Sequence, residues 1–460
     1  MKIKCLLLAV FVSFVAFAEQ SFSLTDDITF RLGGEIRARY EGYNSATVNP
    51  DLPKNHRHHT EYFRNRTKIY GALDFCEHIT INISLANRFQ YVMTSPSNPN
   101  NNDAATWEFP DEVYIDQANV VLKDIFDTGI SLTIGRQNLS FGNGMIISEG
   151  TPYDQGRSVY FDGINLQYDS DLLKLAAFVL YDRWKDGSVF INDRNRRLRS
   201  GDIFTVGTYN TINVSDIINF DVYYIFNDQD DNHPNEIDAI ERAHAVDASV
   251  RLHTVGARIF GKIKLADKWG DFIAYSLEGA GQFGRDADGN HIKGNMLDAR
   301  LQYFVDESWN IKPSAGVEFT HFSGDTPDDG DNRSWNPLMS QCPLWGEELM
   351  PIMLNSVWSN LNMIGGNVSI KPTQKSRFTL YATDYYADDS DGFVGANVNT
   401  GNGRHVGSLF GGNLQYEFLK DYSMLSSLVG QVYVSYFIPG SFFTEERHCT
   451  WFRVEVTAKF

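Results

Sequence analysis

Basic side chains recur at every second position of two segments early in the chain. They are Arg37 and Arg39 in the first segment, and Arg64, Arg66 and Lys68 in the second. Alternate residues of an extended strand share one face, so each set points in one direction. A guanidinium stays charged and holds a carboxylate through two hydrogen bonds. The spacing therefore predicts rows of cationic sites that could attract anions.

Other charged residues could extend or weaken these rows. Arg88, Arg258 and Arg453 alternate with apolar residues in their own strand-like runs. Arg453 would join the first strands if a barrel closed by pairing its last strand with its first. Acidic neighbours could neutralise part of the charge, namely Glu35, Asp74, Asp162 and Glu455. The rows could therefore form an anion-selective lumen, or a nearly neutral salt-bridge lattice without substrate preference. The sequence leaves both readings open.

Residues 130–168 contain two strand-like runs that flank an excursion rich in Gly and Pro. The first run ends in Gly135-Arg136-Gln137, and the second follows Arg157 and contains Phe161-Asp162-Gly163. We predict that these polar residues line the waist of a membrane pore, with the rest of the chain closing a barrel around them.

The strand pattern covers the whole mature chain. We count about 18 alternating runs, which is typical of strands with one apolar and one polar face. They start near residues 28, 60, 78, 111, 129, 158, 172, 201, 216, 247, 271, 293, 309, 358, 374, 404, 424 and 448.

The connections between these runs are alternately long and short. Long ones include 42–59, 139–157 and 324–357, whereas Cys76-Glu77 is among the short ones. This indicates an all-β, antiparallel, up-and-down transmembrane β-barrel with short periplasmic turns and long extracellular loops. A soluble β-sandwich would also show alternation, but it would not readily explain the alternating loop lengths or the even count. No repeat or linker divides residues 19–460, so one barrel domain is predicted.

The N-terminus indicates export. Lys2 and Lys4 precede the apolar residues 5–18, which end in Ala16-Phe17-Ala18. This pattern is typical of a cleaved signal peptide spanning residues 1–18. Because no later apolar stretch is long enough for a membrane helix, the predicted location is the outer membrane of a Gram-negative bacterium.

The chain is acidic, with a formal net charge of −18 that becomes −20 when Lys2 and Lys4 are removed. This argues against a nucleic-acid partner. Most of the acid lies in the predicted loops, where it would meet divalent ions or the lipopolysaccharide surface. The loop Asp286-Ala287-Asp288-Gly289-Asn290 could bind calcium through oxygen atoms, although a solvated loop is the simpler reading. No other cofactor or metal is expected.

The cysteines and the histidines of the first long loop carry weaker hypotheses. Cys342 and Cys449 would both lie on the outer side and could form a disulfide, with Cys76 free at a periplasmic turn. The cluster of His56, His58 and His59 has metal-compatible spacing, but a polar surface loop is the simpler explanation.

Several short segments, in order along the chain, resemble the alginate export family of outer-membrane porins. They are Leu132-Thr133-Ile134-Gly135-Arg136-Gln137, Arg157 with Phe161-Asp162-Gly163, His253-Thr254-Val255-Gly256-Ala257-Arg258, Ser323-Gly324-Asp325, Ile370-Lys371-Pro372-Thr373 and Phe437-Ile438-Pro439-Gly440.

The resemblance implies a monomeric barrel of 18 strands with an arginine-rich constriction that passes an anionic polysaccharide. It implies constriction positions for Arg136, Arg157 and Asp162. Partners would be the polymer or its oligosaccharides, outer-membrane lipid and lipopolysaccharide, and periplasmic export proteins. Residues 406–417 are less polar than this resemblance implies.

The expected function is a non-enzymatic channel that passes an alginate-like polyuronate by passive, charge-selective diffusion. A general porin, or one for uptake of sugars or organic acids, shares every barrel feature. A membrane hydrolase would need a partnered catalytic residue, but His253 and His321 have no evident partner and no G-x-S-x-G elbow occurs. A surface anchor or adhesin would not need the arginines. The direction of transport is not encoded in a passive pore.

Overall fold

The computed structural model describes most of the chain outside the N-terminal segment and several connections. The described residues are 20–44, 59–94, 106–149, 160–193, 201–230, 249–265, 271–305, 309–325, 330–340, 358–392, 401–423, 425–444 and 448–460. The predicted signal peptide and Arg157, Cys342, His56 and His58 lie outside these ranges, so the hypotheses that rest on them are not addressed by the structure.

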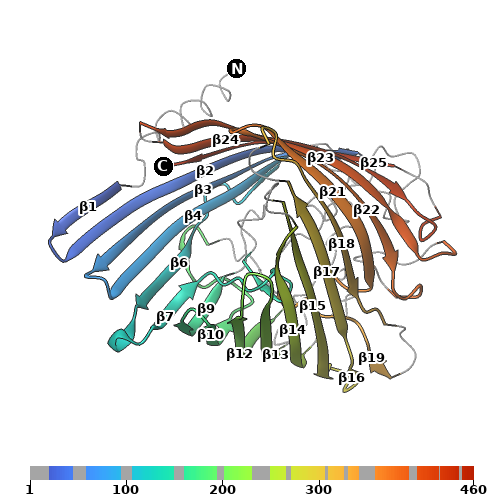
Figure 1. The fold of residues 1–460 in the computed structure, drawn as a ribbon, viewed down its shortest axis with the longest axis horizontal. Coiled ribbons are helices and arrows are strands. Elements are labelled where there is room, and N and C mark those ends of the chain that lie inside the picture. The colour runs from blue at the N-terminus through green and yellow to red at the C-terminus, as the bar shows by residue number, and fades with distance from the viewer. Residues whose placement is uncertain are drawn as a thin grey trace.

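Eighteen antiparallel strands form one closed barrel, in which each strand pairs with the next (Figure 1). The strands are β2 (Ile28–Asn44), β3 (His59–Phe75), β4 (Ile79–Thr94), β6 (Val113–Leu122), β7 (Ile130–Gln137), β9 (Phe161–Asp169), β10 (Leu173–Asp182), β12 (Asp202–Asn213), β13 (Asn219–Asp230), β14 (Val250–Lys264), β15 (Phe272–Arg285), β17 (Asn295–Phe304), β18 (Ser314–Phe322), β21 (Leu361–Thr373), β22 (Ser376–Ala387), β23 (His405–Tyr422), β24 (Leu425–Pro439) and β25 (Cys449–Lys459). β25 pairs with β2 and closes the barrel. The predicted fold class is confirmed, and every predicted strand start lies within five residues of the observed one.

The predicted alternation of loop lengths is also confirmed. Two residues connect β21 to β22 and three connect β9 to β10, whereas 38 residues separate β18 from β21. All short connections lie at one end of the barrel, which we call the short-turn end, because consecutive strands run in opposite directions. The opposite end is the long-loop end. No helix in the described residues is long and apolar enough to cross a membrane.

The two faces of the barrel wall differ as the alternation predicts. Ile81, Ile83 and Val454 remain about half exposed on the outer face, although they are apolar. Arg37, Arg66 and Arg453, on the opposite strand face, are almost completely buried inside the barrel. Apolar side chains outside and polar ones inside are what a strand needs when lipid surrounds the wall and water fills the lumen.

The described part of the structure also contains eight short elements that the pattern does not predict. They are β1 (Gln20–Thr25), β5 (Thr106–Glu108), β8 (Ile147–Ser148), β11 (Val189–Ile191), β16 (His291–Ile292), β19 (Asp331–Asn332), β20 (Met339–Ser340) and the 3-10 turn η1 (Ile125–Asp127). β1 pairs with the first residues of β2, on the edge that β25 occupies further along. β11 crosses the ends of β9 and β7 to pair with β6. The β10–β12 connection, which contains β11, therefore covers the long-loop ends of β7 and β9.

Part of the lumen is filled with apolar side chains from inside. The described part of the β7–β9 connection, residues 138–149, folds inward, and we call it the inward loop. Its strand β8 pairs with β20, which comes from the long β18–β21 connection. Ile147 and Trp335 are completely buried, together with inward side chains of β10, β13 and β21–β24. This apolar core holds both connections against the wall formed by β10–β24.

Candidate functional site in the barrel lumen

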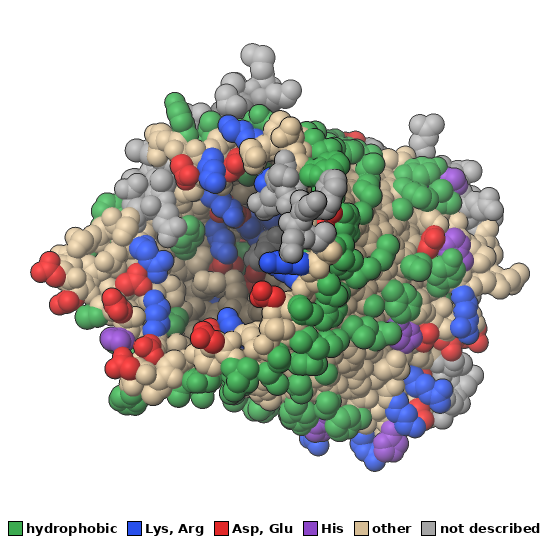
Figure 2. Space-filling view, viewed as in Figure 1, with side chains coloured by type: hydrophobic (Ala, Val, Ile, Leu, Met, Phe, Trp, Pro, Cys, Tyr) green, Lys and Arg blue, Asp and Glu red, His purple; other side chains and the backbone are tan. Residues whose placement is uncertain are grey.

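Seven predicted site residues meet on one part of the inner wall, which we call the cationic wall. Its members are Arg37, Arg39, Arg64, Arg66, Lys68, Arg88 and Arg453. They come from β25, β2, β3 and β4, which are neighbours because β25 closes the barrel on β2. Figure 2 shows Lys and Arg side chains gathered inside a hollow, mixed with Asp and Glu, while apolar side chains cover the outer surface beside it.

Three of these arginines lie in a single row across three strands. Arg37 pairs in register with Arg66, and Arg66 pairs with Arg88. Directly opposed residues of neighbouring strands have Cβ atoms only about 5 Å apart, and like charges at that spacing repel. A row of three cations therefore has no stabilising role by itself. It is favourable when acids above and below, or a bound anion, balance it.

Acidic residues flank this row on the same face. Glu35 accepts hydrogen bonds from Arg66, and Glu455 pairs with Arg39. Lys68 Nζ lies 2.7 Å from a carboxylate oxygen of Asp116 on β6. The cationic wall is therefore partly compensated.

Glu41 is the most enclosed acid of this region. Its carboxylate is buried, with Arg39 at 3.6 Å and Arg64 at 3.8 Å, and it accepts a 2.6 Å hydrogen bond from the hydroxyl of Tyr62. The guanidinium of Arg453 lies 4.0 Å from the centre of the Tyr433 ring, a cation–π arrangement. Each of these contacts fixes an arginine in position, as a stationary charge in a channel wall requires.

The charge of this wall is nevertheless positive. The inward positions of β2, β3, β4 and β25 carry nine Lys or Arg and four Asp or Glu. A narrow lumen with low-dielectric walls concentrates the field of such an excess and raises the local concentration of anions. The negative net charge of the whole chain does not cancel this field, because salt screens charges in the distant loops.

Arg136 and Asp162 form a separate arrangement. Their side chains make a two-bond ion pair, with both nitrogen–oxygen distances at 2.8 Å. The third guanidinium nitrogen of Arg136, Nη1, donates to Asp186 at 3.0 Å and to the carbonyl of Ile115 at 2.8 Å. The guanidinium also stacks on the ring of Tyr160, 3.4 Å from its centre.

The strand register places Arg136 in the wall of the barrel. β7 pairs with β9 without a shift, so Arg136 shares the face of Ile134, which is exposed on the outer surface. Asp186 and Tyr160 cover Arg136 from the neighbouring connections, and only 6% of it is exposed. This geometry favours a role in holding the β10–β12 connection on the wall. A pore-lining role for Arg136 and Asp162 stays a prediction.

Gly135 explains why β7 and β6 can approach so closely at this point. Its φ angle is +114°, and a Cβ atom there would lie 2.4 Å from the carbonyl oxygen of Ala118. Only glycine adopts such a backbone without strain.

Arg258 lies on the opposite part of the inner wall. It pairs with the buried carboxylate of Asp221 and donates a 2.8 Å hydrogen bond to Asn143 of the inward loop. Arg300 on the nearby β17 pairs with Asp298 at 2.9 Å. Arg258 is therefore not brought to the cationic wall, and it helps to anchor the inward loop.

Sequence reasoning did not select Arg300, Lys262 or Lys264, which line a cavity with Arg258. The alternating Lys262 and Lys264 carry the same two-residue spacing as the cationic wall and could have been found by it. The anchoring role of Asn143 leaves no comparable signal, because its partners are more than 100 residues away in the sequence.

The described residues also bear on the predictions made for the cysteines, for the Asp286 loop and for residues 406–417. Cys76 is an exposed free thiol after β3, and Cys449 is buried at the start of β25. The Asp286 carboxylate accepts hydrogen bonds from the backbone of Asp288 and Asn290, so it already closes its own turn. Calcium binding there stays a prediction. On β23 the inward residues up to Glu417 include no Lys or Arg, in line with the low polarity noted in the sequence.

Solved structures with the same fold are outer-membrane proteins. The chain is similar to OccAB1 of Acinetobacter baumannii, at 11% identity, with 97% of this chain and 99% of that one covered and a TM-score of 0.58. It is similar to OprD of Pseudomonas aeruginosa, at 10% identity, with 97% of each chain covered and a TM-score of 0.55. OccK11 (OpdR) of Pseudomonas aeruginosa is 13% identical, with 97% and 99% coverage and a TM-score of 0.54. At these identities the likeness concerns the fold.

The closed barrel with its polar lumen thus defines an outer-membrane β-barrel of the porin class. A sequence model of the family described as alginate export matches residues 29–456. Because this match covers nearly the whole chain, the protein belongs to the alginate export family. Fold and family together make it an outer-membrane channel. No curated protein sequence matches the chain.

Proposed function

We propose that the channel passes an anionic polysaccharide or oligouronate, alginate-like in its carboxylate spacing, by passive, charge-selective diffusion. The observation that carries this proposal is the row of Arg37, Arg66 and Arg88 on three neighbouring strands. A carboxylate that enters the row relieves the repulsion among three cations, so the row favours anion entry.

The partial compensation of the wall supports passage over tight retention. Conduction requires sites that attract an ion but release it. Glu35, Glu41 and Glu455 each weaken the field of an arginine neighbour. A polymer can therefore move from one weak site to the next without being held at any of them.

A general porin, or one for uptake of sugars or organic acids, is the alternative. The same salt bridges favour it, because a wall whose arginines are all balanced would have no polymer selectivity. In either case the protein acts as a channel without catalysis. We propose further that residues 1–18 are a cleaved signal peptide and that the barrel works as a monomer in contact with lipopolysaccharide and periplasmic export proteins.

Single-channel recording in a planar bilayer tests the proposal. The reversal potential under a KCl gradient gives the anion preference, and tetragalacturonate gives the block, with neutral maltotetraose as the control sugar. We expect anion selectivity, and block by the charged oligomer alone. The triple variant Arg37→Gln, Arg66→Gln and Arg88→Gln should lower the anion-to-cation permeability ratio roughly tenfold, at the low end of the effect of field focusing.

Arg251→Gln is the matched control, because this arginine is 76% exposed on the outer face. It should leave the reversal potential unchanged. A wild-type channel with weak or cationic selectivity and no block would overturn the proposal and favour the general porin.

A further inference from the structure

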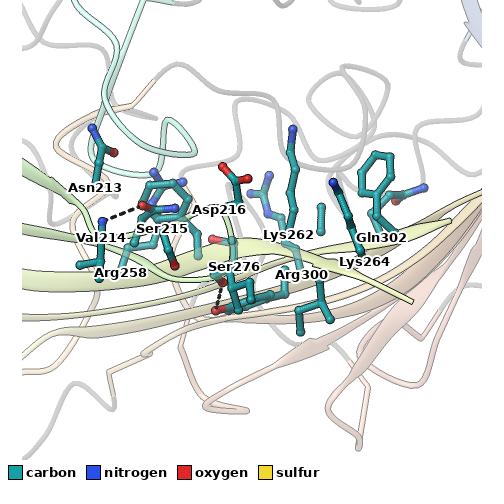
Figure 3. A pocket seen from close by; sticks show the side chains of 18 of the residues that line it. Asn213, Val214, Ser215, Asp216, Arg258, Lys262, Lys264, Ser276, Arg300 and Gln302 are labelled. Carbon is teal, nitrogen blue, oxygen red and sulfur yellow. Dashed lines mark hydrogen bonds between the residues drawn. The ribbon is translucent and has the colours of Figure 1, made fainter. Parts of the chain in front are cut away.

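A cavity of about 1270 Å³ opens at the short-turn end, on the side of the barrel that does not carry the cationic wall. It lies over β14, β15 and β17, beside the turn between β12 and β13. Figure 3 shows Lys262 and Lys264 extending from one face of the sheet in this region, with Arg258, Arg300 and Gln302 nearby.

Small side chains create the hollow. Lys262 pairs in register with Ala274, Ala274 with Gln302, and Gln302 with Gly316. The long side chains of Lys262 and Gln302 therefore lie on either side of Ala274, whose side chain is only a methyl group. A strand wall with this alternation leaves room for a ligand between its polar ends.

The two lysines differ from the arginines of the same cavity. Arg258 and Arg300 are neutralised by the buried carboxylates of Asp221 and Asp298. No carboxylate of the described residues lies within ion-pair distance of Lys262 or Lys264, and both are exposed to the cavity. Asp171 and Asp216 also line the cavity without pairing with either lysine. The ammonium groups are thus available to an anion that enters from the short-turn end.

Aromatic rings lie beside these ammonium groups. Phe272 and Phe304 stack with centres 4.7 Å apart, and Lys262 Nζ lies 5.7 Å from the centre of the Phe272 ring. Phe260 also lines the cavity. An aromatic ring offers a flat apolar surface to the C–H face of a sugar, and an adjacent ammonium offers a counter-charge to its carboxylate. The two together suit an acidic sugar better than a small inorganic anion.

The inward loop borders the cavity through Asn143. Asn143 donates to Ser276 at 3.0 Å and to Asp298 at 3.2 Å, and it accepts from Arg258 at 2.8 Å. A ligand held by Lys262 and Lys264 therefore meets a polar side chain that three hydrogen bonds hold in place.

We propose that this cavity is a second, separate binding site for acidic sugars, which captures a uronate unit at the short-turn mouth before the chain reaches the cationic wall. The choice of an acidic sugar rests on the proposed function, whereas the site itself rests on two ammonium groups that no described carboxylate pairs, the aromatic rings and the hydrogen-bonded Asn143. We therefore expect a polyanion to block the channel differently when it is added at the short-turn end and when it is added at the long-loop end.

Binding and block measured together test this proposal. Tetragalacturonate binding to the full-length protein in detergent is measured by titration calorimetry, in the wild type and in Lys262→Gln/Lys264→Gln. The double variant should lose about tenfold in affinity for the probe, as loss of a focused field predicts. Lys375→Gln, an exposed lysine in the turn between β21 and β22, is the control and should bind as the wild type does.

In the bilayer, the double variant should slow block from the short-turn side and leave block from the long-loop side unchanged. Unaltered binding and equal block from both sides would overturn the second site. Its failure is distinguishable from failure of the proposed function. Binding that disappears in the lysine variant of a channel without anion selectivity would support the cavity and reject the selective pore. The absence of wild-type binding in a channel that is anion-selective would reject the cavity alone.

Discussion

The two sides of the lumen are built from the same alternating strands but are organised in opposite ways. The side formed by β25, β2, β3 and β4 presents charged side chains to a hollow. The side formed by β10–β24 is covered at the long-loop end by an apolar core that includes Ile147, Trp335 and Phe437. The difference arises from the connections, because the inward loop and residues 330–340 bring apolar side chains to one side only.

Under the proposed function, this asymmetry assigns attraction of the anion to one side of the lumen and packing of the inward loop to the other. Charges that face water can act on a passing anion, but charges beneath a packed loop act on the loop. Arg258 illustrates the second case, since its hydrogen bond to Asn143 fixes the loop. Identical residue types therefore serve different functions on the two sides, and variants on each side should have different phenotypes.

The largest expected effect comes from removing the packing on the covered side. Replacing residues 139–148 by a short Gly-Ser linker deletes Ile147 and Asn143 and should raise single-channel conductance several-fold, because the loop occupies lumen cross-section. Conductance in 1 M KCl measures this. The point variant Ser140→Ala, at an exposed position of the same loop, is the control and should change conductance little. Unchanged conductance in the linker variant would show that the loop does not narrow the path.

Breaking a buried charge pair on the cationic wall should be the next largest effect. Glu41→Gln leaves Arg39 and Arg64 without their shared acid and should lower the free energy of unfolding by about 3 kcal/mol, the usual cost of removing one partner of a buried pair. Urea titration of the protein in lipid vesicles measures the loss.

The same variant should raise anion selectivity, because it removes a negative charge from the wall. Glu41→Gln should then lower the free energy of unfolding and raise anion selectivity. This result would distinguish the role of Glu41 in stability from its effect on the charge of the lumen. Glu77→Gln, in the turn between β3 and β4, serves as the control and should change neither quantity. Lower anion selectivity in Glu41→Gln would contradict the lumen assignment of this group.

Arg136 gives a sharper contrast with the cationic wall. Arg136→Gln should lower the unfolding free energy by about 2 kcal/mol, less than Glu41→Gln, because the buried Asp186 keeps a hydrogen bond from the backbone of Ser188 and water can reach Asp162, whose side chain is 37% exposed. The reversal potential should stay at its wild-type value, since the side chain lies within the wall. Limited proteolysis of the β10–β12 connection should become faster. A fall in anion selectivity as large as that of the triple variant would instead return Arg136 to the pore lining.

The smallest effect concerns salt. Raising the salt from 0.1 M to 1 M shortens the Debye length from about 10 Å to about 3 Å and should reduce anion selectivity without abolishing it. Reversal potentials at constant concentration ratio measure this. Selectivity that does not depend on salt would point to a size filter on the covered side in place of the field of the cationic wall.

Much of the barrel could be predicted because the alternation of apolar and polar residues is a local property of each strand. A strand between lipid and water must alternate apolar and polar residues, so the positions of β2, β3, β4 and β25 and the shared face of Arg37 and Arg66 could be read from the sequence. Closure then places Arg453 beside β2. Seven predicted lining residues meet for this reason.

Other features depended on contacts distant along the chain. Arg136 is of the same residue type as the lumen arginines, but its strand register places it on the face of Ile134, where Asp186 and Tyr160 enclose it within the wall. The inward course of residues 138–149 depends on partners at Trp335 and Ser276. The amino-acid sequence alone determined the strands, their faces and the charge of the lumen, because each strand meets its surroundings residue by residue. Only the tertiary structure decided which charges face water and which hold a loop, because that depends on which connection folds over them.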